Sequence, residues 1–230
     1  MNASAREELQ IDQQLDRAAI VRLVNLEHPI TLQGCNLEDT DLSRLDLSEW
    51  RFERCRLARA NFDGATLEDA QFTSCKAGAA SFLGADLLDA VIKSGDFNNV
   101  TFRGASLSSA RFFQCKMTGA DLSEAKILGL ELEEVLFSLA KLPRLSFNKS
   151  ILKQVDFSDA DLGGCDFRGA VFEDCSLRDA HLVDCRFENS DLRGADLGGV
   201  RLTDARRFRG AMISRMQAAE LLGQLGLKVG

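Results

Sequence analysis

The run ASFLGADLLDAVI, residues 80–92, places a large apolar side chain at every fifth position: Phe82, Leu87 and Ile92. This column continues without an insertion from Leu32 to Leu202, at every residue number that ends in 2 or 7. Of its 35 positions, 34 are Leu, Phe, Ile or Met. A repeat of five residues fits neither an α-helix nor a free strand, whose periods are about 3.6 and 2. The period predicts a chain that turns a corner after every five residues.

A second column, of small residues, lies two places before the first, at numbers that end in 0 or 5. From Ile30 to Val200, 26 of its 35 positions are Ala, Cys, Ser, Thr or Gly. Side chains alternate along an extended segment, so the large and the small residue of each repeat should both point inward and fill a narrow core. All seven cysteines fall in this column and are predicted to be buried small hydrophobes, with a redox or metal ladder as the alternative.

Repeats such as Ala85-Asp86-Leu87 and Ala160-Asp161-Leu162 resemble the consensus of the pentapeptide-repeat family. The resemblance covers residues 30–205. It implies an all-β solenoid, a right-handed quadrilateral β-helix with four sides and twenty residues in each coil. About nine such coils, at roughly 4.8 Å per coil, make a rod about 42 Å long. We expect a helix at each end of this rod.

Residues 1–29 depart from the period and are predicted to form a capping helix. Ser4-Ala5-Arg6-Glu7 matches a capping box, and residues 5–27 carry apolar side chains at helical spacing. The first coil has bulky residues, Leu45 and Trp50, in the small column. We expect the helix to cover them, because the open end of a solenoid needs a cap. A partner-binding arm is the alternative.

The period is lost after Leu202, and residues 206–230 are predicted to form a helix, a stop at Gly226 and a short strand. This segment resembles the tails of Qnr-type quinolone-resistance proteins and of the albicidin-immunity protein. The resemblance implies a homodimer of two rods joined at their C-terminal ends; a plain cap without dimerisation is the alternative. The interface residues that it implies are Ile213, Ala218, Leu221, Leu222, Leu225, Leu227 and Val229.

Residues 126–155 keep the period but lose the consensus. Leucine or valine occupies the small column at Leu130, Val135, Leu145 and Val155. Outward positions carry apolar residues, among them Leu128, Leu136, Leu139 and Ile151. Val91 and Val171 lie at whole-coil spacing from Ile151, with Phe113 beside them. Two interpretations stay open: an apolar contact surface, or a coil that is locally widened.

Composition argues against several classes of function. The net charge of −7 and pI of about 5.0 disfavour direct binding of nucleic acid, which needs a basic footprint. No apolar run approaches the roughly 18 residues of a membrane span, and the first thirty residues lack the core of a secretory signal, so we expect a cytoplasmic protein. The sequence has no phosphate loop, nucleophile motif or metal-ligand spacing. We expect no catalysis and no cofactor.

The resemblance implies a DNA-mimicking rod that binds a type II topoisomerase, DNA gyrase or topoisomerase IV, and protects it from a quinolone-like or natural inhibitor. Residues 31–205 carry 29 acidic and 20 basic side chains, whereas a DNA duplex about 42 Å long has about 25 charges. The mimicry is therefore partial. The coils also lack the loop insertions that project from many Qnr-type proteins. A protein–protein adaptor or secreted effector that uses the rod surface and the N-terminal helix is the alternative. Candidate partner-surface residues are Asp159, Asp161, Asp179, Phe113 and Ile151.

Overall fold

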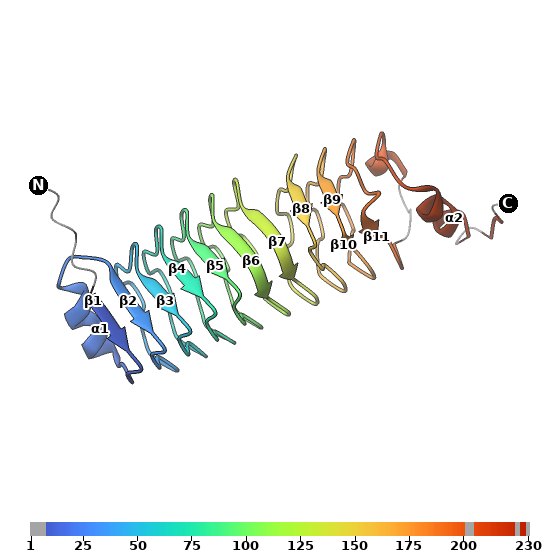
Figure 1. Ribbon diagram of the computed structural model, residues 1–230. Coiled ribbons are helices and arrows are strands. Elements are labelled where there is room, and N and C mark those ends of the chain that lie inside the picture. Colours follow the sequence, from blue (N-terminus) through green and yellow to red (C-terminus); the bar gives the residue numbers. More distant parts are fainter. Residues whose placement is uncertain (1–7, 201–204, 224–225, 229–230) are drawn as a thin grey trace, which may run out of the picture.

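The computed structural model describes residues 8–200, 205–223 and 226–228, and these form a rod of stacked coils (Figure 1). Each coil takes twenty residues: Phe52 on one strand pairs with Phe72 on the next, and Phe72 pairs with Ile92. Strand β1 and helix α2 lie at opposite ends of the rod. The predicted fold is confirmed as a right-handed quadrilateral β-helix of about nine coils with a helix near each end.

Nine strands follow one another in chain order as a single parallel sheet along the rod, and two shorter strands form a second sheet. The elements are β1 (Glu8–Ile11), α1 (Arg17–Val24), β2 (Ile30–Gln33), β3 (Arg51–Glu53), β4 (Gln71–Thr73), β5 (Val91–Lys93), β6 (Arg111–Lys116), β7 (Glu131–Leu136), β8 (Ile151–Lys153), β9 (Val171–Glu173), β10 (Cys175–Ser176), β11 (Ala195–Asp196), the 3-10 helix η1 (Ala205–Phe208) and α2 (Arg215–Gly223).

The four sides of a coil are named here from its first residues. Side A comprises residues 31–35 and their equivalents at every twentieth residue, and it carries β2 to β9. Side B begins at residue 36, side C at residue 41 and side D at residue 46, each with the same spacing. One side is one pentapeptide, so every column of the sequence becomes a row of stacked side chains.

The two inward columns fill the core as the sequence predicts. Among the large residues, phenylalanines stack from coil to coil: the ring centroids of Phe52 and Phe72 are 4.6 Å apart with an angle of 3° between the ring planes. Phe62 and Phe82 on another side repeat this spacing, and the two stacks meet edge to face. Small residues beside them, such as Ala60 and Ala80, are also buried. A small side chain is needed because the ring next to it already fills the narrow interior.

The residue types at outward positions depend on whether the position lies at a corner of the coil. At most coil positions whose numbers end in 4 or 9 the backbone takes the left-handed conformation, with φ of 57° at Asp39 and 60° at Leu139. Glycine, asparagine and aspartate tolerate this conformation best. Many corners therefore carry Gly, Asn or Asp, although Ala79 and Leu139 also occupy corners.

One boundary between coils is open on side D. In the boundary before it, five backbone N–H groups donate across the coils: those of Gly104, Leu107, Ser109, Lys126 and Glu131. In the boundary after it, the equivalent five bonds also form, from Arg144, Phe147, Lys149, Asp166 and Val171. Between residues 124–131 and 143–151, all of which are described, none of these five bonds is present. The ladder closes again where β7 pairs with β8 through Leu132 and Leu152.

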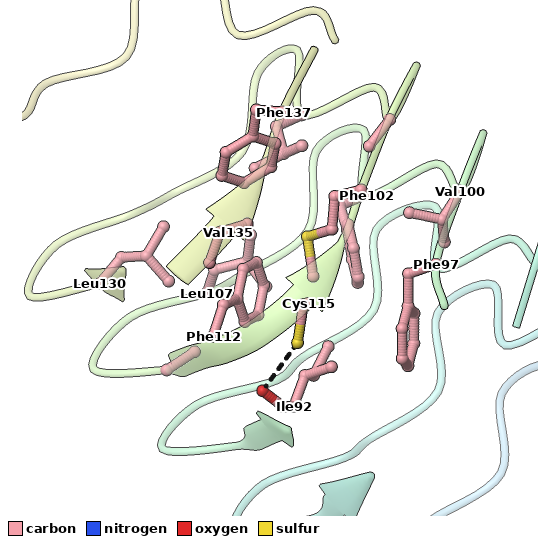
Figure 2. Close-up of a cluster of buried hydrophobic side chains, with 14 of the residues drawn as sticks. Ile92, Phe97, Val100, Phe102, Leu107, Phe112, Cys115, Leu130, Val135 and Phe137 are labelled. Carbon is pink, nitrogen blue, oxygen red and sulfur yellow. Dashed lines mark hydrogen bonds between the residues drawn. The ribbon is translucent and has the colours of Figure 1, made fainter. Parts of the chain in front are cut away.

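Bulky side chains in the small column coincide with this opening. Leu130 and Leu145 stand where most coils have alanine or cysteine. Figure 2 shows the transition: the thiol of Cys115 donates to the carbonyl of Ile92 (3.2 Å), whereas the next coil has Val135 at the equivalent position and Leu130 before it. Extra volume in a close-packed core must move something. We infer that it separates the coils on side D, as a locally widened coil would.

The N-terminal prediction is wrong in its first half. Residues 8–11 of the expected helix form strand β1, which pairs with β2 and adds part of a coil. Helix α1 begins only at Arg17, where the Asp16 carboxylate accepts the N–H of Ala19 (2.8 Å). The expected capping box lies among residues that the structure does not describe.

Helix α1 nevertheless lies against the end of the rod (Figure 1). Its Ile20 is fully buried, and Arg17 donates to the backbone carbonyls of Asp41 and Ser43 in the first complete coil. Trp50 is buried and Leu45 packs against the same core. This is the arrangement of a cap.

The coil pattern also extends past the expected C-terminal boundary. The ring of Phe208 stacks on Phe187 with centroids 4.9 Å apart, and the N–H of Met212 donates to the carbonyl of Ser190. The spacing of 21 residues shows that one additional residue has been accommodated. The division of the chain at residues 29 and 205 stays a prediction, but inter-coil pairing crosses both boundaries.

Candidate partner-binding surfaces

The three predicted acidic residues gather at one edge of the rod. Asp159 and Asp179 are exposed corner residues one coil apart, both in the left-handed conformation. Asp161 follows on side C, where its carboxylate contacts the ring nitrogen Nδ1 of His181 (2.9 Å). That hydrogen bond lowers the pKa of Asp161. The edge therefore presents three carboxylates, one of them with a titratable partner.

A longer acidic row was missed from the sequence. Side D and its corner expose six carboxylates over three successive coils, and none of them forms an ion pair with another described residue: Asp46, Glu49, Glu68, Asp69, Asp86 and Asp89. Folding the sequence at twenty residues per coil brings these residues into one file, so the signal was present in the spacing. The row ends before Lys126 and the open boundary.

Phe113 and Ile151 line the same groove on side A, which has a volume of about 790 Å³. The ammonium of Lys93 lies 5.5 Å from the centroid of the Phe113 ring, within cation–π range. Ile151 is 56% exposed. Leu128, Leu136 and Leu139 are exposed as well, but they lie on sides D and B, so the predicted outward leucines do not form one stripe.

The C-terminal end of the rod has an apolar surface around α2. Ile213, Leu222 and Leu227 are exposed, and Ala218 is half-buried. Leu221 is buried in the core of its own rod, so it contributes to the cap. Leu225 and Val229 lie outside the described residues. The structure adds two exposed residues that the sequence analysis did not select, Met212 and Met216.

Gln217 shows how α2 is fixed to the last coil. Its buried side-chain amide donates to the backbone carbonyls of Leu192 (2.7 Å) and Ala195 (2.6 Å). Its Oε1 accepts the N–H of Ser214, and the Ser214 hydroxyl accepts the N–H of Gln217, which together form a capping box. The amide replaces donors that a further coil would supply, so the helix closes this end of the ladder.

The cysteines lie in the core. All seven are free and buried, and thiols such as Cys165 and Cys185 donate to carbonyls of the preceding coil (both 3.0 Å). Burial raises the pKa of Cys175 and of Cys185 to about 11. A protonated, enclosed thiol is a poor nucleophile and a poor metal ligand. Across the described part of the chain, no group of three or more His, Cys, Asp or Glu side chains is placed to hold a metal ion.

These features define a class of protein: a β-helical rod with a filled apolar core and an exposed outer surface. Three family models match, the pentapeptide repeat region over residues 28–102 and two models of pentapeptide repeats over 105–142 with 170–206 and over 137–181. The chain belongs to the pentapeptide-repeat proteins. No described helix is long and apolar enough to cross a membrane.

Solved structures of the same fold include QnrB1, a plasmid-mediated fluoroquinolone resistance protein. Full-length QnrB1 is 20% identical, with a TM-score of 0.66, and the match covers 96% of this chain and 98% of QnrB1. A trypsin-treated QnrB1 variant gives 22% identity and a TM-score of 0.68 over 89% of this chain and all of the other. HetL, from the cyanobacterium Nostoc, is 22% identical with a TM-score of 0.45, over 81% of this chain and 86% of its own. No curated protein sequence matches the chain.

Proposed function

We propose that this rod binds a type II topoisomerase, DNA gyrase or topoisomerase IV, and protects it from a quinolone-like or natural inhibitor. The observation that carries the proposal is the match to full-length QnrB1 over nearly the whole of both chains. The exposed acidic rows supply a physical basis, because they can compete with DNA for a basic surface. The proposed setting is the cytoplasm, where these enzymes act on DNA.

A supercoiling assay tests the proposal directly. Low concentrations of the rod should rescue gyrase or topoisomerase IV from a cleavage-stabilising inhibitor, and an excess should itself inhibit the enzyme. Binding should weaken as salt is added, because charges are screened over roughly 8–10 Å at ordinary ionic strength. If neither rescue nor inhibition appears with either enzyme, the adaptor alternative replaces this proposal.

Charge reversal separates two ways of recognising the partner. Asp159, Asp161 and Asp179 changed to Lys should weaken binding while the melting temperature stays near that of the unmodified rod, since all three lie on the surface. The matched variant changes Phe113 and Ile151 to Ser, which removes the apolar groove but keeps the charge. Loss of binding only in the second variant would show that apolar contact, and not mimicry of DNA, carries recognition.

The apolar C-terminal end is proposed to pair two rods into a homodimer. Met216→Glu with Leu222→Glu should give a folded monomer by light scattering, because both side chains are exposed and a buried pair of carboxylates opposes association. Arg215→Glu on the same helix is the control, since it changes charge at an exposed polar position. A dimer that survives the double change would remove this end from the interface.

A further inference from the structure

The open boundary on side D connects two grooves. On side A it meets the groove lined by Phe113, Leu130 and Ile151. On side C it meets a second groove, about 1070 Å³ in volume, lined by Glu124, Pro143 and Leu145. The two grooves thus flank the opening, one on side A and the other on side C.

The two edges of the opening, residues 124–131 and 143–151, are called its lips. They expose main-chain N–H and C=O groups whose equivalents are hydrogen-bonded at the neighbouring boundaries. The free N–H groups belong to Glu124, Ile127, Gly129, Ser146 and Ile151. The carbonyls that would accept from them belong to Ala125, Leu130, Pro143, Ser146 and Asn148. Donors and acceptors are thus present in equal number, and they alternate along the chain as in any parallel ladder.

This alternation indicates the chemistry of the occupant. A phosphate or carboxylate accepts hydrogen bonds and could use only the donors, whereas an extended polypeptide offers both kinds of group at the spacing of a strand. Unpaired strand edges bind extended peptides in this way in other proteins, with pockets for alternate side chains. The groove on side A supplies such a pocket between Phe113 and Ile151.

The charged residues around that pocket indicate which side chains the bound segment would carry. Lys93, Lys149 and Lys153 line the groove together with Arg111, against two glutamates, Glu131 and Glu133. Lys149 and Lys153 are exposed, and neither forms an ion pair with another described residue. A segment with an apolar residue in the pocket and an acidic residue next to it would complement both features.

We propose that the open boundary between residues 124–131 and 143–151 is a docking site for one extended segment of a partner polypeptide. The main chain of the segment pairs with the free groups of the lips, and one of its apolar side chains occupies the pocket between Phe113 and Ile151. This proposal goes beyond the proposed action on topoisomerases, which rests on the acidic rows and the C-terminal end; of the candidate contact residues for that action, Phe113 and Ile151 also lie at the docking site.

Hydrogen exchange tests the opening itself. The amides of Ile127, Gly129 and Ile151 should exchange at least about tenfold faster than those of Leu107, Ser109 and Glu131, their equivalents one coil earlier. Equal protection of the two sets would mean that the ladder is closed in solution, and the proposal would fall.

Binding is tested with a fluorescein-labelled pool of blocked octapeptides that alternate Thr with Val, Leu, Phe or Glu. A second pool has the same side chains and a methyl group on every second backbone nitrogen. The first pool should bind, slow the exchange of the Gly129 and Ile151 amides, and bind at least about tenfold more tightly than the methylated pool, since several main-chain bonds are lost. No binding at about 1 mM, or equal binding of both pools, overturns the proposal.

A reversible closure adds a control within the rod. Leu128→Cys with Asn148→Cys places two exposed thiols across the opening, and a disulfide between them holds the lips within the roughly 7 Å that its geometry allows between Cα atoms. Ser108→Cys with Leu128→Cys does the same across the closed boundary. Oxidation of the first pair should abolish peptide binding and reduction restore it, while the second pair has no effect. Unchanged binding by the oxidised first pair contradicts the proposal.

Discussion

The coils of residues 51–120 and the boundary at residues 121–155 share one repeat but differ in how they close. In the first region alanine and cysteine dominate the small column and the backbone ladder forms on all four sides. In the second, Leu130 and Leu145 take small sites and the ladder opens on side D. Bulky residues in the small column coincide with the opening here, whereas in the first coil Leu45 and Trp50 occupy the same columns and all five equivalent bonds form.

Magnitudes explain why this opening is tolerated. Burying a leucine in place of an alanine adds about three carbons, worth roughly 2.4 kcal/mol each time by transfer. Five lost backbone bonds cost a net of roughly 0.5–1.5 kcal/mol each. The two effects are of comparable size, so the rod can exchange hydrogen bonds for apolar burial at one boundary and stay folded.

The largest expected effect contrasts two large-column residues one coil apart. Leu107→Ala should lower the free energy of unfolding by about 2–5 kcal/mol, because it leaves a cavity in a sealed core. Ile127→Ala should cost at least about 1 kcal/mol less, since Ile127 already borders the opening and its surroundings can relax. Urea denaturation of both variants measures the difference. Equal losses would mean that the two regions pack alike.

A second substitution should create a similar opening between two regular coils. Ala110 is the equivalent of Leu130 one coil earlier, so Ala110→Leu should overpack the core and cost about 1–3 kcal/mol. The amides of Ser109 and Glu131, which now bond across that boundary, should exchange faster. Ser108→Leu, an outward change in the same coil, should stay within about 0.5 kcal/mol. If Ala110→Leu lowers the free energy of unfolding but leaves the exchange of these amides unchanged, overpacking of the core does not break the backbone ladder.

The reverse change should close the existing opening. Leu130→Ala removes volume from the widened coil, and the returning backbone bonds should hold the loss of stability below about 1.5 kcal/mol. Slower exchange of the Gly129 and Ile151 amides would report the closure. If the loss of stability is as large as is usual for a buried leucine and the Gly129 and Ile151 amides still exchange fast, some other feature keeps the coils apart.

The smallest effect concerns the closed side of the same boundary. Burial raises the pKa of Asp156, but hydrogen bonds from Ser158 and from Ser138 of the preceding coil outweigh it and hold that pKa below its usual value. The bonds therefore stabilise the rod above the ordinary aspartate pKa of about 3.9, and this stability is lost as the pH falls through the lower folded value.

Asp156→Asn should accordingly cost about 0.5–1.5 kcal/mol at neutral pH, and the difference from the unmodified rod should shrink in acid. Thermal melts over a pH series measure it. Asp159→Asn is the matched control, because its side chain makes no hydrogen bond or ion pair with other described residues. A constant difference at every pH would assign the loss to shape and not to charge.

Much of the structure of this rod can be predicted from its sequence, because each five-residue side repeats the same pattern of inward and outward positions. The inward columns, the buried cysteines and the outward aspartates all follow from that period. Even the acidic row on side D is contained in the sequence, once its residues are aligned at twenty per coil.

Three features depend on the assembled structure. Residues 8–11 are predicted to be helical, yet they form β1 because the free edge of β2 offers backbone partners along its length. Phe208 returns to the core although one additional residue precedes it, because its ring can stack on the ring of Phe187. The opening on side D lies where Leu130 of one coil and Leu145 of the next fall on either side of one boundary. No single repeat contains this pairing, because it arises only when the coils are stacked.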